Sequence, residues 1–79
     1  MTHAHKIFIR SKKEDSAFIY LIFEAQGGWA SYSTLPFKSH DPFRDIELSV
    51  TDDFLILVRD LLQSLNEIVS ILPGDPSKA

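Results

Sequence analysis

The sequence predicts a small two-layer α+β domain whose elements follow in the order strand, helix, strand, strand, helix. Residues 6–10 and 44–50 alternate apolar and polar side chains, which is the period of a strand with one buried face. Residues 54–68 repeat apolar side chains at helical spacing. Between the first two stretches lies the apolar run 17–23, and the topology depends on whether this run is a helix or a strand.

The signals around the run 17–23 favour a helix over residues 12–26. Ser11 and Glu14 have the spacing of a capping box, in which two side chains bond the free amides of a first turn. Gly27 and Gly28 follow the run, and glycine is the usual residue just after a helix end.

The spacing within this helix predicts which residues face the sheet. Ile19, Tyr20 and Phe23 fall outside the predicted inner face, which consists of Phe18, Leu21, Ile22 and Ala25. A competing interpretation makes residues 12–16 a hairpin loop and residues 17–25 a strand, because β-branched and aromatic side chains favour strands.

The second half of the chain predicts two strands and a helix. Residues 29–35 read as a strand that ends at Pro36, and residues 35–43 as a turn-rich connection. In the strand 44–50, Ile46, Leu48 and Val50 point inward. Asp52 and Asp53 then open the last helix. Its predicted inner face is Phe54, Val58, Leu61, Leu65 and Ile68, flanked by Leu55, Leu57, Leu62 and Val69.

These elements assemble into a sheet of spatial order 2-3-1 with both helices on one face. A right-handed crossover makes the first two strands parallel, and the third fits between them as an antiparallel neighbour. This arrangement is the ferredoxin-like split βαβ plan, with the fourth strand short or absent; residues 70–72 could supply it. The single domain spans residues 6–72, with a flexible N-terminus at 1–5 and a flexible tail at 73–79.

Composition narrows the function classes. The chain has 79 residues, eight Lys and Arg, eleven Asp and Glu, and no cysteine, which excludes disulfides and argues against nucleic-acid binding. We find no export signal, and the longest apolar run is shorter than the roughly 20 residues of a membrane span. We therefore expect a cytoplasmic protein that contacts neither nucleic acid nor membrane.

The layout of residues 6–71 resembles that of small bacterial ACT-like domains and of short bacterial βαββα proteins of unknown function. The resemblance rests on the strand 6–10, the Ser11–Glu14 spacing, the apolar helix, the Gly27-Gly28 pair, residues 45–51 and the acidic start of the last helix. It implies the fold and, as an alternative function, regulation through a small metabolite held at a subunit interface. In ACT domains that site lies near a glycine-bearing turn, whereas residues 10–13 contain no glycine.

Polar clusters in the sequence have structural explanations that compete with functional ones. His3, His5 and His40 could hold a metal ion, or they could be solvated imidazoles. Helix capping explains Asp52 and Asp53 better than acid–base catalysis does. Solvation on the wet face of the strand explains the nearby Asp45 and Glu47. Arg10, Lys12 and Lys13 could attract an anion, but a solvated turn explains them better. We expect no catalytic residue, metal or cofactor.

We therefore expect a noncatalytic module that works by association, as a homodimer or as a subunit of a larger complex. A domain of this size buries only about 60% of its unfolded surface, so a second subunit would add to a thin core. An open sheet edge also invites pairing. The possible interface residues are Phe8, Ile19, Tyr20, Phe23, Trp29 and Tyr32.

Overall fold

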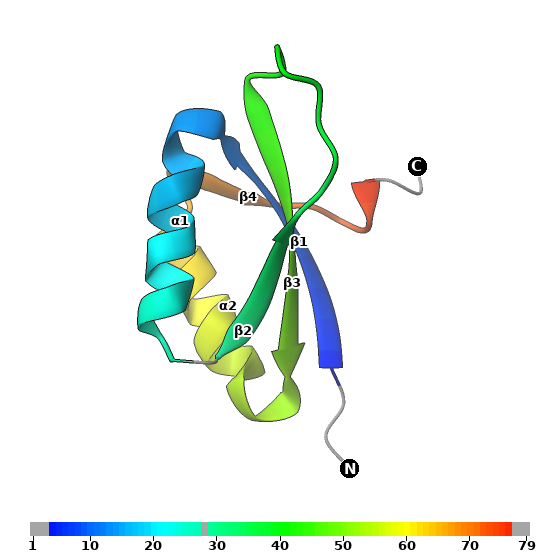
Figure 1. Ribbon diagram of the computed structural model, residues 1–79. Helices are drawn as coiled ribbons and strands as arrows, with labels where there is room; N and C mark the ends of the chain where they lie inside the picture. Colours follow the sequence, from blue (N-terminus) through cyan, green and yellow to red (C-terminus); the bar gives the residue numbers. More distant parts are fainter. Residues whose placement is uncertain (1–3, 28, 77–79) are drawn as a thin grey trace.

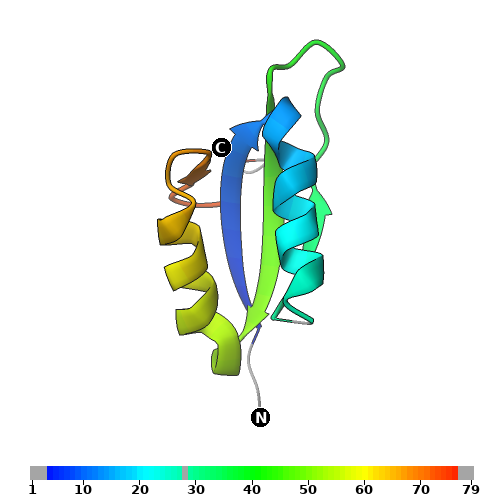
Figure 2. The ribbon, with the colours of Figure 1, turned by 90° about the vertical axis from the view of Figure 1, so that its left-hand side faces the viewer.

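Both helices lie against one face of a single sheet in the computed structural model, which describes residues 4–27 and 29–76 (Figures 1 and 2). The elements in chain order are β1 (Ala4–Lys12), α1 (Lys13–Ala25), β2 (Ala30–Thr34), β3 (Phe43–Thr51), a short 3-10 helix (Asp52–Phe54), α2 (Leu55–Ser64) and β4 (Val69–Ile71). The α+β class is thereby confirmed.

The sheet has four strands in the order β2-β3-β1-β4, and every neighbouring pair is antiparallel. The predicted order of the first three strands and the β2–β3 hairpin are therefore correct. The fourth strand is present and short: β4 pairs with β1 over three residues, from Ile9 opposite Ile71 to Ser11 opposite Val69.

The apolar run forms a helix, so the competing strand interpretation is wrong. α1 spans Lys13–Ala25, within one residue of the predicted range at each end, and Gly27 follows it with a φ of +66°. The predicted capping box is not formed. Ser11 belongs to β1 and its hydroxyl donates to the carbonyl of Lys12, so the helix begins only after the strand has finished. Gly28 lies outside the described residues.

The predicted inner face of α1 is wrong. Ile19 and Phe23 are buried in the core, with exposed fractions of 0% and 2%. Phe18 and Leu21, which were expected to face the sheet, are 54% and 63% exposed. The helix is rotated so that the residues assigned to its outer side fill the core.

The core lies between the helices and the inner face of β1 and β3. Ile46, Leu48 and Val50 of β3 are fully buried, as the alternation predicted. From α2 the fully buried residues are Val58 and Leu62, whereas the predicted Leu61 is only half-buried and Leu57 is exposed. Val58 and Leu62 are four residues apart, the spacing of neighbours on one face of an α-helix, so the helix turns its predicted flanking stripe further into the core.

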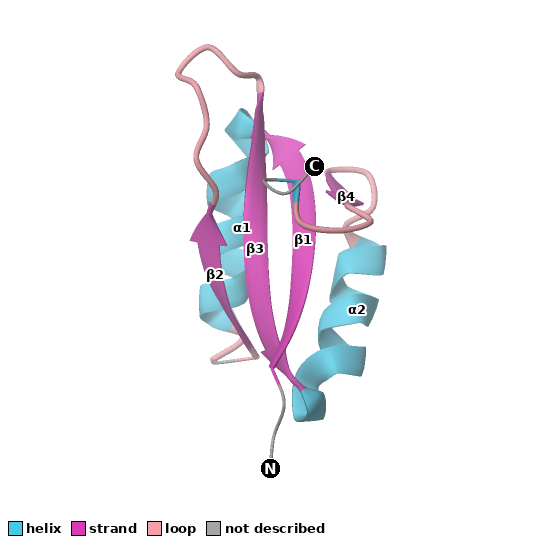
Figure 3. Cartoon of the chain, turned by 90° about the vertical axis from the view of Figure 1, so that its right-hand side faces the viewer, coloured by secondary structure: helices cyan, strands magenta, loops and turns pink. Residues whose placement is uncertain are grey.

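The other face of the sheet is polar, and the segment after β4 crosses it (Figure 3). Two ion pairs join β1 to β3 on this face, Arg10 with Asp45 and Lys6 with Glu47. Phe8 lies between them in sequence, and its carbonyl accepts a hydrogen bond of 2.7 Å from the amide of Leu72. Phe8 is only 9% exposed.

The predicted start of the domain needs correction. β1 begins at Ala4, so Ala4 and His5 belong to a strand and not to a flexible N-terminus. The segment 73–76, predicted as part of a flexible tail, lines a pocket with Arg10 on the polar face. Residues 1–3 and 77–79 lie outside the described part of the chain.

Candidate functional site

The outer side of β2 is an open edge of the sheet over the whole strand. Within the described residues, no strand pairs with β2 on the side away from β3. Its sequence, Ala-Ser-Tyr-Ser-Thr, contains no charge and no proline, which are the usual devices that protect an edge from pairing. The opposite edge consists of β4, which has only three residues and runs towards Pro73, and of the part of β1 before Ile9, which carries the charged Lys6. The two edges are therefore not equivalent, and β2 is the one open to a partner strand.

The hydrogen-bond phase of the hairpin shows which groups of β2 are free to pair. The amide of Leu35 donates to the carbonyl of the directly opposite residue Asp45, at 2.9 Å. In an antiparallel pair, hydrogen-bonded and non-hydrogen-bonded positions alternate. Ser31 and Ser33 therefore direct their main-chain groups towards β3, whereas Ala30, Tyr32 and Thr34 direct theirs outward.

A pair of stacked tyrosines supports this edge on the helix side. The rings of Tyr20 from α1 and Tyr32 from β2 lie with centroids 4.8 Å apart and an angle of 14° between their planes. The Tyr20 hydroxyl hydrogen-bonds the hydroxyl of Thr34, and the Tyr32 hydroxyl donates to the carboxylate of Glu24. The bond to Glu24 raises the pKa of Tyr32 above its ordinary value, and desolvation adds to this effect. These contacts fix β2 against α1.

Of the six predicted interface residues, the structure leaves three half-buried and buries the other three. Tyr20 and Tyr32 come together at the β2 edge, half-buried against the core. Trp29, just before β2, stacks on Phe54 at 6.2 Å and also packs on the core. Phe8, Ile19 and Phe23 are buried within this chain, so they lack the exposed surface that the interface hypothesis assumed.

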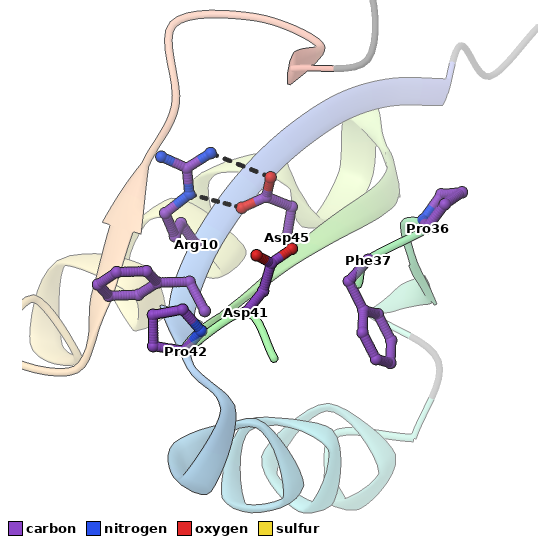
Figure 4. A pocket seen from close by; sticks show the side chains of 7 residues that line it. Arg10, Pro36, Phe37, Asp41, Pro42 and Asp45 are labelled. Carbon is purple, nitrogen blue, oxygen red and sulfur yellow. Dashed lines mark hydrogen bonds and ion pairs between the residues drawn. The ribbon is translucent and has the colours of Figure 1, made fainter. Parts of the chain in front are cut away.

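A second candidate lies at the end of the sheet beside the β2–β3 loop (Figure 4). It is a pocket of about 240 Å³ lined by Arg10, Asp45, Asp41, two phenylalanines and two prolines. Arg10 donates to both oxygens of Asp45, at 2.7 and 3.1 Å, and this pairing raises the pKa of Arg10 above its ordinary value. Arg10 and Asp45, two of the three charged residues that line the pocket, therefore already bind each other.

The loop that walls this pocket is held by its own contacts. The guanidinium of Arg44 lies 3.6 Å from the ring centroid of Phe37 and donates to the carbonyls of Asp41 and Phe43. The Asp41 carboxylate accepts the amide of Lys38 at 3.1 Å. Asp41 and Arg44 therefore have structural partners within the loop.

A third pocket lies where β1 turns into α1, and it contains part of the predicted basic cluster. It has a volume of about 430 Å³ and is lined by Arg10, Ser11, Lys12, Asp15, Phe43, Glu67 and three residues of the β4 segment. Lys13 does not line it. Acidic and basic side chains are mixed there, so the pocket does not favour a simple anion.

The remaining sequence candidates do not converge on a metal centre. His5 pairs with Asp52, and His40 lies exposed in the β2–β3 loop. Across residues 4–27 and 29–76, no group of three or more His, Cys, Asp or Glu side chains is placed to share a metal ion. His3 lies outside the described residues. Asp52 and Asp53 start the 3-10 helix, but neither it nor α2 has a side-chain cap at its N-terminus.

Sequence reasoning missed several exposed apolar side chains. Phe18 and Leu21 on α1, Ile56 on α2, Phe37 in the β2–β3 loop and Phe43 at the start of β3 are each at least 47% exposed. Ile56 stands beside Leu57 in an apolar run, and only its angle on the helix places it outside. The sequence does contain a signal of exposure for Phe37 and Phe43, because each directly follows a proline in a turn-rich stretch.

Neither α1 nor α2, the α-helices of the described chain, has the length and apolar content needed to cross a membrane.

Comparison of the chain with protein-family models, with curated proteins and with solved structures found no match.

Proposed function

We propose that this protein is a noncatalytic interaction module that binds an extended protein segment along the open edge of β2. The observation that carries the proposal is the uncharged, proline-free edge with its outward groups at Ala30, Tyr32 and Thr34. Strand addition of this kind gains affinity from main-chain hydrogen bonds. In the pocket beside the β2–β3 loop, by contrast, Arg10 and Asp45 already bind each other.

The support from α1 makes the edge suitable for this role. A strand held only by β3 would fray, but Tyr32 and Thr34 are bonded to α1 through Glu24 and Tyr20. A pre-organised strand loses little conformational entropy when a partner binds it, so more of the interaction energy appears as affinity. The edge is therefore ready to pair without rearrangement.

A second candidate function is metabolite sensing by a ferredoxin-like domain of ACT type. The order βαββαβ supports it, as does the pocket of about 430 Å³ beside the β1–α1 turn. Lys12 could bind the carboxylate of an amino acid there and Asp15 its ammonium group. The missing glycine in this turn weighs against the proposal, and the pocket's mixed charges leave the ligand class open.

The edge proposal is tested with isotope-labelled protein observed by NMR in unlabelled extract of its host. We expect the amides of Ala30, Tyr32 and Thr34 to exchange slowly, because a partner strand accepts their hydrogen bonds. This protection appears only in extract if the partner is another protein, and already in concentrated buffer if the partner is a second copy. Shifts confined to residues 11–15 would favour metabolite sensing. Unprotected β2 amides both in extract and in concentrated buffer would contradict the edge proposal.

Thr34→Pro is the blocking variant and Thr34→Val its matched control. Both remove the hydroxyl that meets Tyr20, but only proline removes the outward amide. Since that amide makes no bond to β3, proline is expected to leave the hairpin folded. The changes on β2 should persist with valine and disappear with proline.

A further inference from the structure

We propose that the segment bound by β2 is β2 of a second copy, paired antiparallel about a two-fold axis through Tyr32. This inference rests on the proposed function and names the partner. In the resulting dimer the two sheets join edge to edge into one continuous sheet, with the two α1 helices on the same face.

The hydrogen-bond phase selects this register. The outward groups belong to Ala30, Tyr32 and Thr34, so only pairings that place these residues opposite one another form bonds. Centring on Tyr32 gives three hydrogen-bonded pairs: Tyr32 with its own copy and Ala30 with Thr34 in both directions. Centring on Ser31 or Ser33 leaves only two. Beyond Thr34 the next outward position is Pro36, which has no amide to donate.

The side chains of β2 are nearly symmetric about the same residue. Read in either direction from Tyr32, the strand presents a serine and then a small residue, Ala30 or Thr34. The two-fold pairing therefore sets Ser31 opposite Ser33 on the polar face and tyrosine opposite tyrosine on the helix face. Hydroxyl and aromatic cross-strand pairs of this kind stabilise sheets.

Electrostatics also permits self-pairing. A strand with charged residues repels its own copy, because two-fold symmetry brings like charges together. None of the five residues of β2 is charged, so its self-pairing meets no such repulsion. The β4 edge lacks these features, since it offers three residues and is followed by Pro73.

The register is tested by disulfide formation, because the chain contains no cysteine and each introduced thiol is the only one. In the Tyr32-centred register, Ser31 faces Ser33 of the other copy at a non-hydrogen-bonded position, about 4.5 Å between Cα atoms. This separation lies within the disulfide range, whereas like residues stand diagonally at about 7–8 Å and do not. Ser31→Cys and Ser33→Cys proteins, one of them ¹⁵N-labelled, are mixed and mildly oxidised.

We expect mass spectrometry to show the mixed-isotope disulfide dimer as the main product. Each variant oxidised alone should remain mostly free of intermolecular disulfide. Adding Thr34→Pro to both variants should reduce the yield about tenfold or more, because each copy loses an outward donor. Adding Thr34→Val should leave the yield near its original level.

Three other outcomes overturn the inference. Self-linking of Ser31→Cys alone or of Ser33→Cys alone would establish a different register. Equal yields of all three disulfides would indicate random collision. A purified wild-type protein that sediments as a monomer at every concentration from micromolar to about millimolar would exclude a second copy as the partner. If β2 amides still respond in host extract, the edge function then stands with a different strand as its partner.

Discussion

At the scale of single residues, Gly27 is where the sequence and the backbone depend most directly on each other. It is the only described residue with a positive φ, at +66°, and it ends α1 in the conformation that glycine adopts most easily. An added Cβ would meet no atom within 4 Å, so space does not restrict this position. The demand for glycine comes from the backbone alone.

Gly27→Ala is therefore expected to lower the free energy of unfolding by about 1–2 kcal/mol, the cost of a left-handed conformation for an L-residue. Urea denaturation followed by circular dichroism measures it. Gly74→Ala is the control, since Gly74 has equal space around it but no positive φ. Equal effects from the two substitutions would contradict the backbone explanation.

The stability that the Tyr32 hydroxyl contributes depends on pH. Its hydroxyl donates to Glu24, and this bond raises its pKa above the ordinary value of 10.0. A group whose pKa is raised by folding contributes stability below its unfolded pKa and loses that contribution as the pH passes its folded pKa. The contribution of the Tyr32 hydroxyl is thus complete at neutral pH and falls away in alkaline solution.

We expect Tyr32→Phe to be less stable than wild type at pH 7, with the difference shrinking above about pH 10. Urea unfolding at several pH values gives the comparison. Absorbance titration at 295 nm checks the cause: the wild-type curve should contain a tyrosine that titrates later than free tyrosine, and Tyr32→Phe should lose it. A constant difference across this pH range would count against the bond to Glu24.

At the scale of elements, the orientation of α1 sets which side chains fill the core. Ile19 and Phe23 point into it, and Tyr20 lies on the side of β2, where it stacks on Tyr32. Successive helix residues are about 100° apart, so Phe18 lies some 200° from Tyr20, on the side away from β2. The tyrosine stack therefore accounts for the exposure of Phe18.

Ile19→Ala is expected to lower the free energy of unfolding by about 2–5 kcal/mol, because it leaves a cavity in a fully packed site. Leu21→Ala on the same helix should change it by less than about 1 kcal/mol, since Leu21 is mostly exposed. Denaturation of both variants in urea measures the difference. A larger effect at Leu21 would restore the helix face that spacing alone predicts.

The sequence predicts the elements of this fold better than their orientation. Alternation in β3 identifies its buried face correctly, because a strand offers only two faces and Ile46, Leu48 and Val50 all fall on one. The apolar run of α1 has no polar side to mark the outside, so several orientations bury similar area. Ser11 resembles a cap, but pairing of β1 with β3 through Lys12 keeps it in the strand.

The candidate site was predicted only in part for a related reason. An aromatic residue gives the same sequence pattern in a core and in an interface, so residue type does not show that Phe23 is a core residue and Tyr32 an edge residue. Which groups of β2 face outward depends on its pairing with β3, and a single bond between Leu35 and Asp45 sets that phase. Nothing local to β2 encodes it.

At the scale of the whole molecule, the two faces of the sheet are covered differently. Helices cover one face, while ion pairs and the segment after β4 occupy the other (Figure 3). Phe8 is thereby buried on a face that would otherwise be wet. In the described part of the chain, the helices on one face and the charged pairs on the other leave the edges of the sheet as the positions where another strand can join.

The shortness of β4 has a consequence for how far such joining can proceed. When β2 of each copy meets β2 of the other, both β2 edges are used at once. The outer borders of the combined sheet are then the three-residue β4 strands, each running towards Pro73, and the part of β1 before Ile9, which carries the charged Lys6. Growth beyond two copies would need those borders to accept further strands. The geometry thus favours a closed pair over an endless fibril.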